Sequence, residues 1–252
     1  MMRTILSILA LSLMFCSCSG SDVKNYRLEV VAEYPHDTTS YTQGLFLKDG
    51  QLYESTGLNG KSTFRVVDMK TGKALRKLDF DKKYFVEGSV IFDNNLYILT
   101  WENKVVFIYD AETLEYKSTH RYARQGWGLT TDGESLIASD GSANLYFMGP
   151  DLKLKERLFV TLNDRPVNWL NELEYINGRI WANVYTREEI VIINPRTGKV
   201  EGIVDCSGLL PRDLRGEYTD VLNGIAYNAE DGKIYLTGKN WPRMYEIRIV
   251  EI

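Results

Sequence analysis

The sequence predicts an all-β fold over residues 26–252, a five-bladed β-propeller closed by its N-terminal strand. Three observations predict it. A short motif occurs five times at intervals of roughly 40–50 residues, each copy is followed by alternating apolar residues and turn residues, and the last copy lacks a strand that the N-terminal segment can supply. A shared period of this length is typical of one closed repeat domain rather than of separate sheets.

Each copy of the motif begins with a polar or aromatic residue, usually followed by glycine. The five starts are Gln43-Gly44, Glu87-Gly88, Trp127-Gly128, Asn171-Glu172 and Asn223-Gly224. Turn-forming pairs such as Asp132-Gly133 and Asn177-Gly178 follow at the point where the chain must reverse. We therefore expect second strands over residues 51–57, 95–101, 135–141, 179–185 and 233–239.

The rest of each copy predicts the outer strands. Third strands are expected over residues 64–68, 106–110, 145–148, 189–194 and 244–249, and fourth strands over 74–80, 116–122, 155–160 and 200–204. The fifth copy ends without a fourth strand, and residues 26–34 alternate as a strand without a repeat of their own. This strand is expected to complete the last sheet and to protect its edge. Residues 207–220 are expected to form a surface insertion with a short helical turn.

Residues 1–17 resemble a bacterial lipoprotein signal. Arg3 precedes an apolar run over residues 5–15, which is too short to span a bilayer, and Ser17 is followed by Cys18. We expect Cys18 to be the lipidated first residue of the mature chain, residues 18–25 to be a short tether, and the protein to be anchored in the cell envelope, in the periplasm or at the outer membrane. The alternative is an ordinary secretory signal that is cleaved nearby.

Composition and rare residues exclude several classes of function. The net charge of −4 and the absence of basic runs argue against nucleic-acid binding. The mature chain would hold only Cys18 and Cys206, too few for a disulfide scaffold, and Cys206 is expected to be a buried thiol. His36 and His120 are the only histidines and do not have metal-ligand spacing, so we expect no histidine zinc site. The sequence also lacks a serine nucleophile elbow and a phosphate-binding glycine loop.

The repeat also predicts where a site would lie. First strands of a propeller line its central channel, so residues at one repeat position should meet in a ring: Gln43, Glu87, Trp127, Asn171 and Asn223. The second strands end at the same mouth, with Trp101, Tyr185 and Lys239. One carboxylate, one ammonium, several amides and aromatic walls are typical of a small-molecule site.

The same residues allow other interpretations. Burial among indoles would raise the pKa of Glu87 and suit it to acid–base catalysis. Glu87 and Lys239 could instead form a structural salt bridge in the channel. A glycosidase would need a second carboxylate; strand alternation is expected to point Glu172 away from the face of Asn171, whereas Glu174 remains open.

Several stretches resemble the plant- and bacterial-type glutaminyl-peptide cyclotransferases, which are metal-independent. They include residues 41–45, 87–88, 99–101, 126–130, 170–175, 181–185, 222–227 and 236–239, and so come from all five repeats. The resemblance implies a five-bladed propeller without a cofactor. It also implies that the substrates are peptides or proteins with an N-terminal glutamine, which is cyclised to pyroglutamate with release of ammonia. The family's functional residues match Gln43, Glu87, Trp101, Trp127, Asn171 and Lys239.

The resemblance also suggests roles for these residues. Glu87 is expected to be the general acid and base, Asn171 and Lys239 are expected to stabilise the oxyanion, and Gln43 is expected to orient the substrate. The expected substrate-binding residues also include Trp101, Trp127, Tyr185 and Asn223. Tyr185 departs from the family, which often has tryptophan there. We expect a monomer; the rival hypothesis is a non-catalytic envelope propeller that binds a peptide or glycan at the same mouth.

Overall fold

The computed structural model describes residues 23–252, which form an all-β fold. The expected signal segment and Cys18 lie outside these residues. The 207–220 insertion contains the short helical turn that the sequence predicts, the 3₁₀ turn η1 (Arg212–Leu214). Within residues 23–252, we find no helix with the length and apolar character needed to span a membrane.

Three separate antiparallel sheets have four strands each, and the chain adds their strands in order from the inside outward. The first contains β2 (Thr42–Lys48), β3 (Gln51–Thr56), β4 (Thr63–Asp68) and β5 (Lys73–Asp79). The second contains β6 (Val86–Phe92), β7 (Asn95–Thr100), β8 (Val105–Asp110) and β9 (Tyr116–Arg121). The third contains β10 (Leu129–Thr131), β11 (Leu136–Ser139), β12 (Asn144–Met148) and β13 (Leu154–Phe159).

The remaining long strands form one eight-stranded sheet, in the order β16-β17-β18-β19-β1-β22-β21-β20. Its strands are β1 (Lys24–Pro35), β16 (Leu170–Ile176), β17 (Arg179–Val184), β18 (Glu189–Ile193), β19 (Val200–Asp205), β20 (Leu222–Asn228), β21 (Lys233–Gly238) and β22 (Arg243–Glu251). The N-terminal strand β1 pairs antiparallel with β22, as expected. Its parallel pairing with β19 was not expected. A small hairpin of β14 (Thr161–Leu162) and β15 (Arg165–Pro166) was also not predicted.

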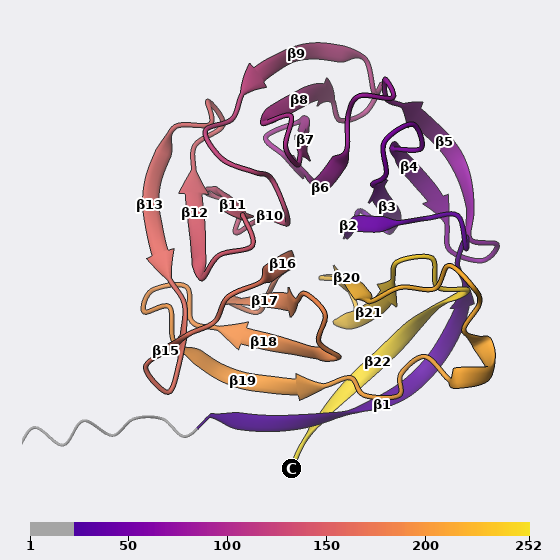
Figure 1. The fold of residues 1–252 in the computed structure, drawn as a ribbon, viewed down its shortest axis with the longest axis vertical. Helices are drawn as coiled ribbons and strands as arrows, with labels where there is room; N and C mark the ends of the chain where they lie inside the picture. The colour runs from indigo at the N-terminus through magenta and orange to yellow at the C-terminus, as the bar shows by residue number, and fades with distance from the viewer. Residues whose placement is uncertain (1–22) are drawn as a thin grey trace, which may run out of the picture.

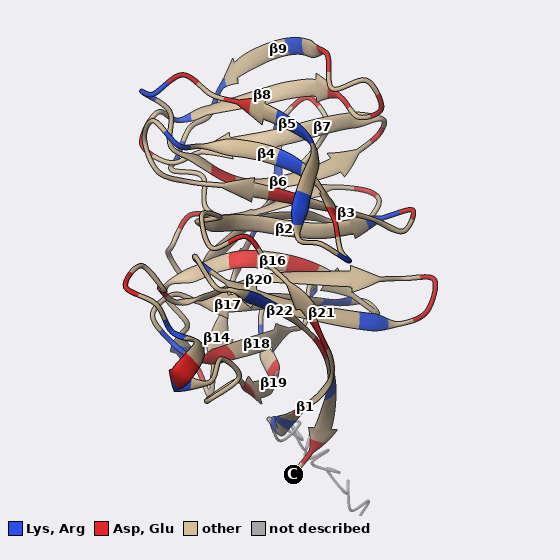
Figure 2. Cartoon of the chain, turned by 90° about the vertical axis from the view of Figure 1, so that its right-hand side faces the viewer, with Lys and Arg blue, Asp and Glu red and all other residues tan. Residues whose placement is uncertain are grey.

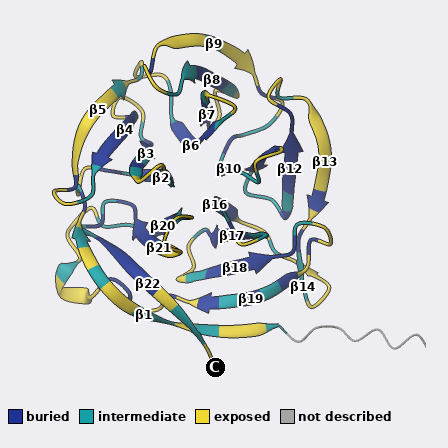
Figure 3. Cartoon of the chain, turned by 180° about the vertical axis from the view of Figure 1, so that it is seen from behind, coloured by how far each residue is buried: buried dark blue, intermediate teal, exposed yellow. Residues whose placement is uncertain are grey.

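The sheets stand around a common centre (Figure 1). Their innermost strands are β2, β6, β10, β16 and β20; each contacts the next, and β20 contacts β2 again. Buried apolar side chains form clusters between neighbouring sheets, for example around Phe64 and Ile98 between the first and second sheets. Figure 3 shows buried inner strands and exposed outer strands such as β5, β9 and β13. The outer strands thus shield a buried inner ring.

Glycine at the second motif position allows the inner strands to approach one another. A Cβ atom on Gly88 would collide with the Leu129 nitrogen, and one on Gly128 would collide with the backbone carbonyl of Asn171. Any larger residue would push neighbouring sheets apart. At these two positions the close packing of the inner strands therefore requires glycine.

Four of the five inner strands share a second feature, a β-bulge at the motif itself. The pairing register shifts between Thr42 and Gly44 in β2, and the same shift occurs in β6, β16 and β20, at Val86/Ser89, Leu170/Leu173 and Leu222/Ile225. A bulge interrupts the alternation of side chains and redirects them. The motif residues consequently sit where the strand can turn polar side chains into the channel.

Candidate active site

A cavity of about 280 Å³ opens at one end of the channel. Its lining residues come from the starts of inner strands and the ends of second strands: Tyr41, Gln43, Phe85, Glu87, Trp101, Trp127, Trp169, Asn171, Tyr185 and Lys239. The structure thus brings together seven of the eight site residues placed in the channel from the sequence. The volume is at the small end of the range that is usual for small-molecule sites.

Aromatic side chains form the walls of the cavity. The Phe85 and Trp101 rings meet edge to face at 5.5 Å between centroids, and Trp127 meets Tyr185 at 5.7 Å. The indole nitrogens of Trp101 and Trp127 both donate to the side-chain oxygen of Gln125, at 3.0 and 3.3 Å. One amide therefore holds two indoles from different sheets in place.

A polar chain crosses the floor of the cavity. The Gln43 amide nitrogen lies 3.4 Å from a Glu87 carboxylate oxygen, and the Lys239 ammonium donates to the Gln43 amide oxygen. Lys239 also donates to the Thr42 carbonyl at 3.0 Å. No direct ion pair joins Glu87 and Lys239, so the alternative of a simple salt bridge is wrong: Gln43 lies between the two charges.

Burial changes the ionisation of both charged groups. It raises the pKa of Glu87 well above the ordinary carboxyl value, although the Lys239 ammonium opposes this. Burial lowers the pKa of Lys239 to about 8, against the attraction of Glu87, Asp220 and Glu172. Burial thus disfavours the charged form of both groups.

Lys239 is held almost completely inside the protein, with 1% of its surface exposed. Its ammonium lies 4.6 Å from the centre of the Tyr41 ring, a cation–π contact. The Tyr41 hydroxyl donates to Asp220 at 2.8 Å, and the Asp220 carbonyl accepts from the Trp241 indole at 2.9 Å. These contacts fix the direction in which Lys239 presents its charge.

Two amides of the motif have different positions. Asn171 lines the cavity, and its buried side-chain oxygen has no hydrogen-bond partner within residues 23–252. Asn223 does not line the cavity. Its amide nitrogen donates to the Thr42 carbonyl at 3.0 Å and to the Gln43 side-chain oxygen at 3.5 Å. We therefore assign Asn223 to the support of Gln43 rather than to substrate contact.

Sequence reasoning missed three lining residues, Tyr41, Phe85 and Trp169. Each stands two positions before a motif residue: before Gln43, Glu87 and Asn171 in turn. In two repeats the same position carries Gln125 and Val221, so it is not aromatic throughout. A second register of the repeat, read two residues upstream, would have identified them.

Glu172 does not line the cavity that its neighbour Asn171 lines. Its carboxylate points into the ring and accepts from the backbone nitrogens of Leu45 and Ile225, at 3.2 and 2.9 Å. The pairing register of β16 shifts between Leu170 and Leu173, the stretch that holds Asn171 and Glu172. Figure 2 shows the acidic part of β16 at mid-height in the molecule, between the other strands.

Glu174 does not provide the second carboxylate of a glycosidase. It accepts from the Tyr227 nitrogen at 3.0 Å and from the Thr130 hydroxyl at 3.3 Å, and it is absent from the cavity lining. Burial raises its pKa to about 8. Both extra glutamates therefore join inner strands of different sheets.

Metal-binding side chains are not grouped in the part of the chain that the structure describes. Over residues 23–252, no three histidine, cysteine, aspartate or glutamate side chains lie together as metal ligands. His36 is buried and bonded to Glu54 instead, and Cys206 is a buried free thiol, as expected.

Comparison with known proteins decides the family. The family model described as glutamine cyclotransferase matches residues 4–249. The chain belongs to the glutamine cyclotransferase family. It is 42% identical over 229 residues to a glutaminyl-peptide cyclotransferase of Arabidopsis thaliana, covering 88% of this chain and 71% of the relative.

A solved structure agrees with this assignment. The crystal structure of Myxococcus xanthus glutaminyl cyclase superposes with a TM-score of 0.85 at 34% identity, covering 92% of this chain and all of the other. The glutamine cyclotransferase fold is thus shared over nearly the whole chain. The cavity with Glu87 and Lys239 is its candidate active site.

Proposed function

We propose that this protein is a glutaminyl-peptide cyclotransferase, an acyltransferase that converts the N-terminal glutamine of peptides and proteins to pyroglutamate and releases ammonia. The observation that carries the proposal is one cavity with aromatic walls that is lined by both a buried carboxylate, Glu87, and a buried ammonium, Lys239. Family membership supplies the reaction class.

The reaction needs one proton to move twice. The α-amine of the substrate attacks the γ-carbonyl carbon of its own side chain, forms the new C–N bond and loses a proton. Glu87 accepts this proton and returns it to the γ-amide nitrogen, so that the old C–N bond breaks and ammonia leaves. Burial raises the pKa of Glu87, which favours its return of the proton to the leaving nitrogen.

The other polar groups stabilise and orient the substrate. In this proposal the Lys239 ammonium and the Asn171 amide, which both line the cavity, donate to the oxyanion that forms on the γ-carbonyl oxygen. The unpaired oxygen of Asn171 can in addition accept an N–H of the substrate. Gln43, held between Glu87 and Lys239, fixes the spacing of the two charged groups.

The aromatic walls account for the rest of the catalysis. Trp101, Trp127 and Tyr185 enclose the folded-back conformer of the glutamine side chain and exclude water. Because the attack is intramolecular, restricting the substrate to this conformer lowers the barrier. Tyr185 replaces the indole common in the family and leaves a smaller wall there, which alters substrate preference.

The proposal is tested by incubating the purified protein with a glutamine-initiated dipeptide and a metal chelator. We expect stoichiometric release of ammonia at a rate that the chelator does not change. Binding of the dipeptide without ammonia release would instead favour a non-catalytic binding protein, and inhibition by the chelator would contradict the proposed chemistry.

We further propose that the ring is a five-bladed propeller. The eight-stranded sheet then counts as two blades, β16–β19 and β20, β21, β22 with β1, joined by the short parallel pairing of β1 with β19. Two features support this count. The inner strands form one closed series, and separate apolar clusters lie between successive sheets.

We also propose that the mature protein is a monomer anchored in the cell envelope through a lipidated Cys18. The sequence of residues 1–18 supports the anchor. Mass spectrometry of the mature N-terminus is expected to find a diacylated, N-acylated Cys18. An unmodified N-terminus at another residue would contradict the anchor and leave the catalytic proposal intact.

A further inference from the structure

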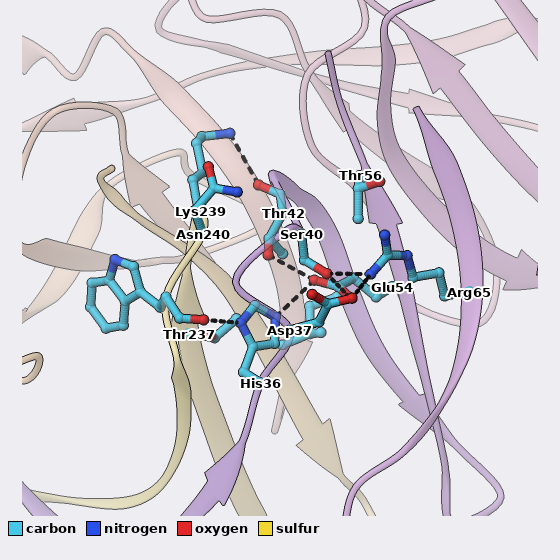
Figure 4. Close-up of polar contacts among 12 residues, drawn as sticks. His36, Asp37, Ser40, Thr42, Glu54, Thr56, Arg65, Thr237, Lys239 and Asn240 are labelled. Carbon is cyan, nitrogen blue, oxygen red and sulfur yellow. Dashed lines mark hydrogen bonds and ion pairs between the residues drawn. The ribbon is translucent and has the colours of Figure 1, made fainter. Parts of the chain in front are cut away.

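A buried cluster of polar residues lies behind the candidate active site and has no part in the proposed chemistry. It joins the end of β1 to β3 and β4, and we call it the seam cluster: His36, Ser40, Thr42, Glu54 and Arg65 (Figure 4). All five side chains are buried. Polar groups at this depth need partners, and here they find them in one another.

Glu54 is the centre of the seam cluster. One of its carboxylate oxygens accepts from the Thr42 hydroxyl at 2.7 Å and from the His36 ring nitrogen Nε2 at 2.9 Å. The other accepts from the Ser40 hydroxyl at 3.0 Å. The Arg65 guanidinium approaches the same hydroxyl at 2.7 Å and pairs with Asp37 at 2.8 Å. A carboxylate that only accepts hydrogen bonds in this way is ionised.

His36 must then be a cation. Its Nε2 faces the Glu54 carboxylate, and its Nδ1 faces the backbone carbonyl of Trp241 at 2.7 Å. Both partners only accept, so both ring nitrogens carry protons. Burial by itself lowers the pKa of His36. The charge and hydrogen bond of Glu54, the hydrogen bond to the Trp241 carbonyl and the charge of Asp37 together outweigh burial and raise this pKa above its ordinary value.

The seam cluster touches both chain segments that carry the polar floor of the cavity. Along residues 40–43, Ser40 and Thr42 bond to Glu54, whereas Tyr41 and Gln43 line the cavity. Thr42 links the seam cluster directly to Lys239. Its hydroxyl donates to Glu54, and its carbonyl accepts from the Lys239 ammonium at 3.0 Å.

The second segment, residues 239–241, is fixed from the same side. The Asn240 nitrogen donates to the Ser40 carbonyl at 2.7 Å, and the Trp241 carbonyl accepts from His36. His36 therefore connects the two segments. One of its ring nitrogens bonds to the segment that carries Lys239, and the other bonds to Glu54, which in turn holds the segment that carries Gln43.

We propose that the His36–Glu54 pair is a positioning element for the active site: it locks the two segments together and so sets the Lys239 ammonium against Gln43 and the Thr42 carbonyl, away from water. The effect of this positioning element on catalysis rests on the proposed function. Its effect on structure, a Lys239 ammonium that is held in one position without contact to water, does not.

Two substitutions separate the two contacts of His36. His36→Gln can keep the bond to Glu54 but not the one to Trp241, and His36→Asn the reverse. Both are expected to admit water to Lys239. Burial lowers the pKa of Lys239, whereas the negative charges of Glu87, Asp220 and Glu172 raise it. Contact with water would weaken the effect of burial and so raise the pKa of Lys239. His120→Gln is the matched control, because His120 lies exposed on β9.

The direct readout is the titration of Lys239 by NMR of ¹³C-lysine-labelled protein, with the signal assigned through Lys239→Arg. We expect a midpoint near 8 in the wild type and control, and a rise of about one pH unit in the His36 variants. The variants should also lose about ten- to hundredfold in kcat with a smaller change in KM, as misplaced catalytic groups do.

An unchanged Lys239 midpoint in folded His36 variants would overturn the proposal. If these variants do not fold, the near-isosteric Glu54→Gln gives the same test, because it removes the charge that holds His36 protonated. The titration needs no turnover, so an inactive wild-type protein would contradict the proposed function without deciding the positioning role.

Discussion

Replacing Glu87 with glutamine is expected to lower kcat for a glutamine-initiated dipeptide by about 10²- to 10⁴-fold, the usual contribution of a general acid–base group. KM should change little, because the amide keeps the shape of the side chain and can still contact Gln43. The measurement is the initial rate of ammonia release at saturating substrate.

The fold should survive this substitution. Burial raises the pKa of Glu87 above the value it has in the unfolded chain. At neutral pH the unfolded chain ionises this carboxyl group freely, so the group contributes least to the stability of the fold there. Thermal unfolding at pH 7 is therefore expected at the same or a higher temperature in Glu87→Gln. Glu156→Gln, on the exposed strand β13, is the control. Full activity in Glu87→Gln would remove the assignment of Glu87.

Lys239→Met is expected to lower kcat/KM by about 10²- to 10³-fold, the usual loss when one oxyanion donor is removed. The size of the effect should depend on pH. Because the pKa of Lys239 is about 8, the ammonium is present below that pH and is lost above it. The ratio of wild-type to variant activity should therefore be largest below pH 8 and should shrink as the pH rises.

Lys239→Arg separates charge from shape. An arginine keeps its charge to high pH, so the ratio of wild-type to Lys239→Arg activity should also fall above pH 8, even if the longer side chain slows the reaction. Lys48→Met, at the exposed end of β2, should match the wild type at every pH. A pH-independent ratio for Lys239→Met would show that Lys239 does not act through its ammonium.

The repeat made most of the strands predictable. The expected second strand at residues 51–57 is β3 (Gln51–Thr56), and the one at 179–185 is β17 (Arg179–Val184). Local alternation and turn pairs determine these boundaries. The pairing of β1 with β19 was not visible, because it brings together edges that only the closed ring places side by side.

The candidate-site residues that occupy repeat positions could be predicted from the sequence. Features that depend on contacts between different strands could not. Glu87, Asn171 and Lys239 meet because they occupy equivalent or facing repeat positions. The partners of Glu172, the backbone nitrogens of Leu45 and Ile225, lie on two other inner strands, so no local pattern reveals them. Asn223 occupies the same repeat position as the cavity residues Gln43 and Asn171, but its amide nitrogen donates to the Thr42 carbonyl instead.

The histidine of the seam cluster shows a further limit. From the sequence, His36 was only a residue without metal spacing. Its partners Glu54 and Trp241 come from β3 and from the segment before β22, so no local pattern links them. Closure of the ring by the N-terminal strand creates this contact, and with it the link to Lys239.

The central claim is that this cavity cyclises an N-terminal glutamine. The most direct measurement is the mass spectrum of one glutamine-initiated peptide after incubation with the protein, beside the same peptide with its α-amine acetylated. We predict that the free peptide loses the mass of one ammonia and becomes resistant to Edman degradation, while the acetylated peptide is unchanged. An unaltered free peptide, or equal loss of ammonia from the acetylated one, would contradict the account.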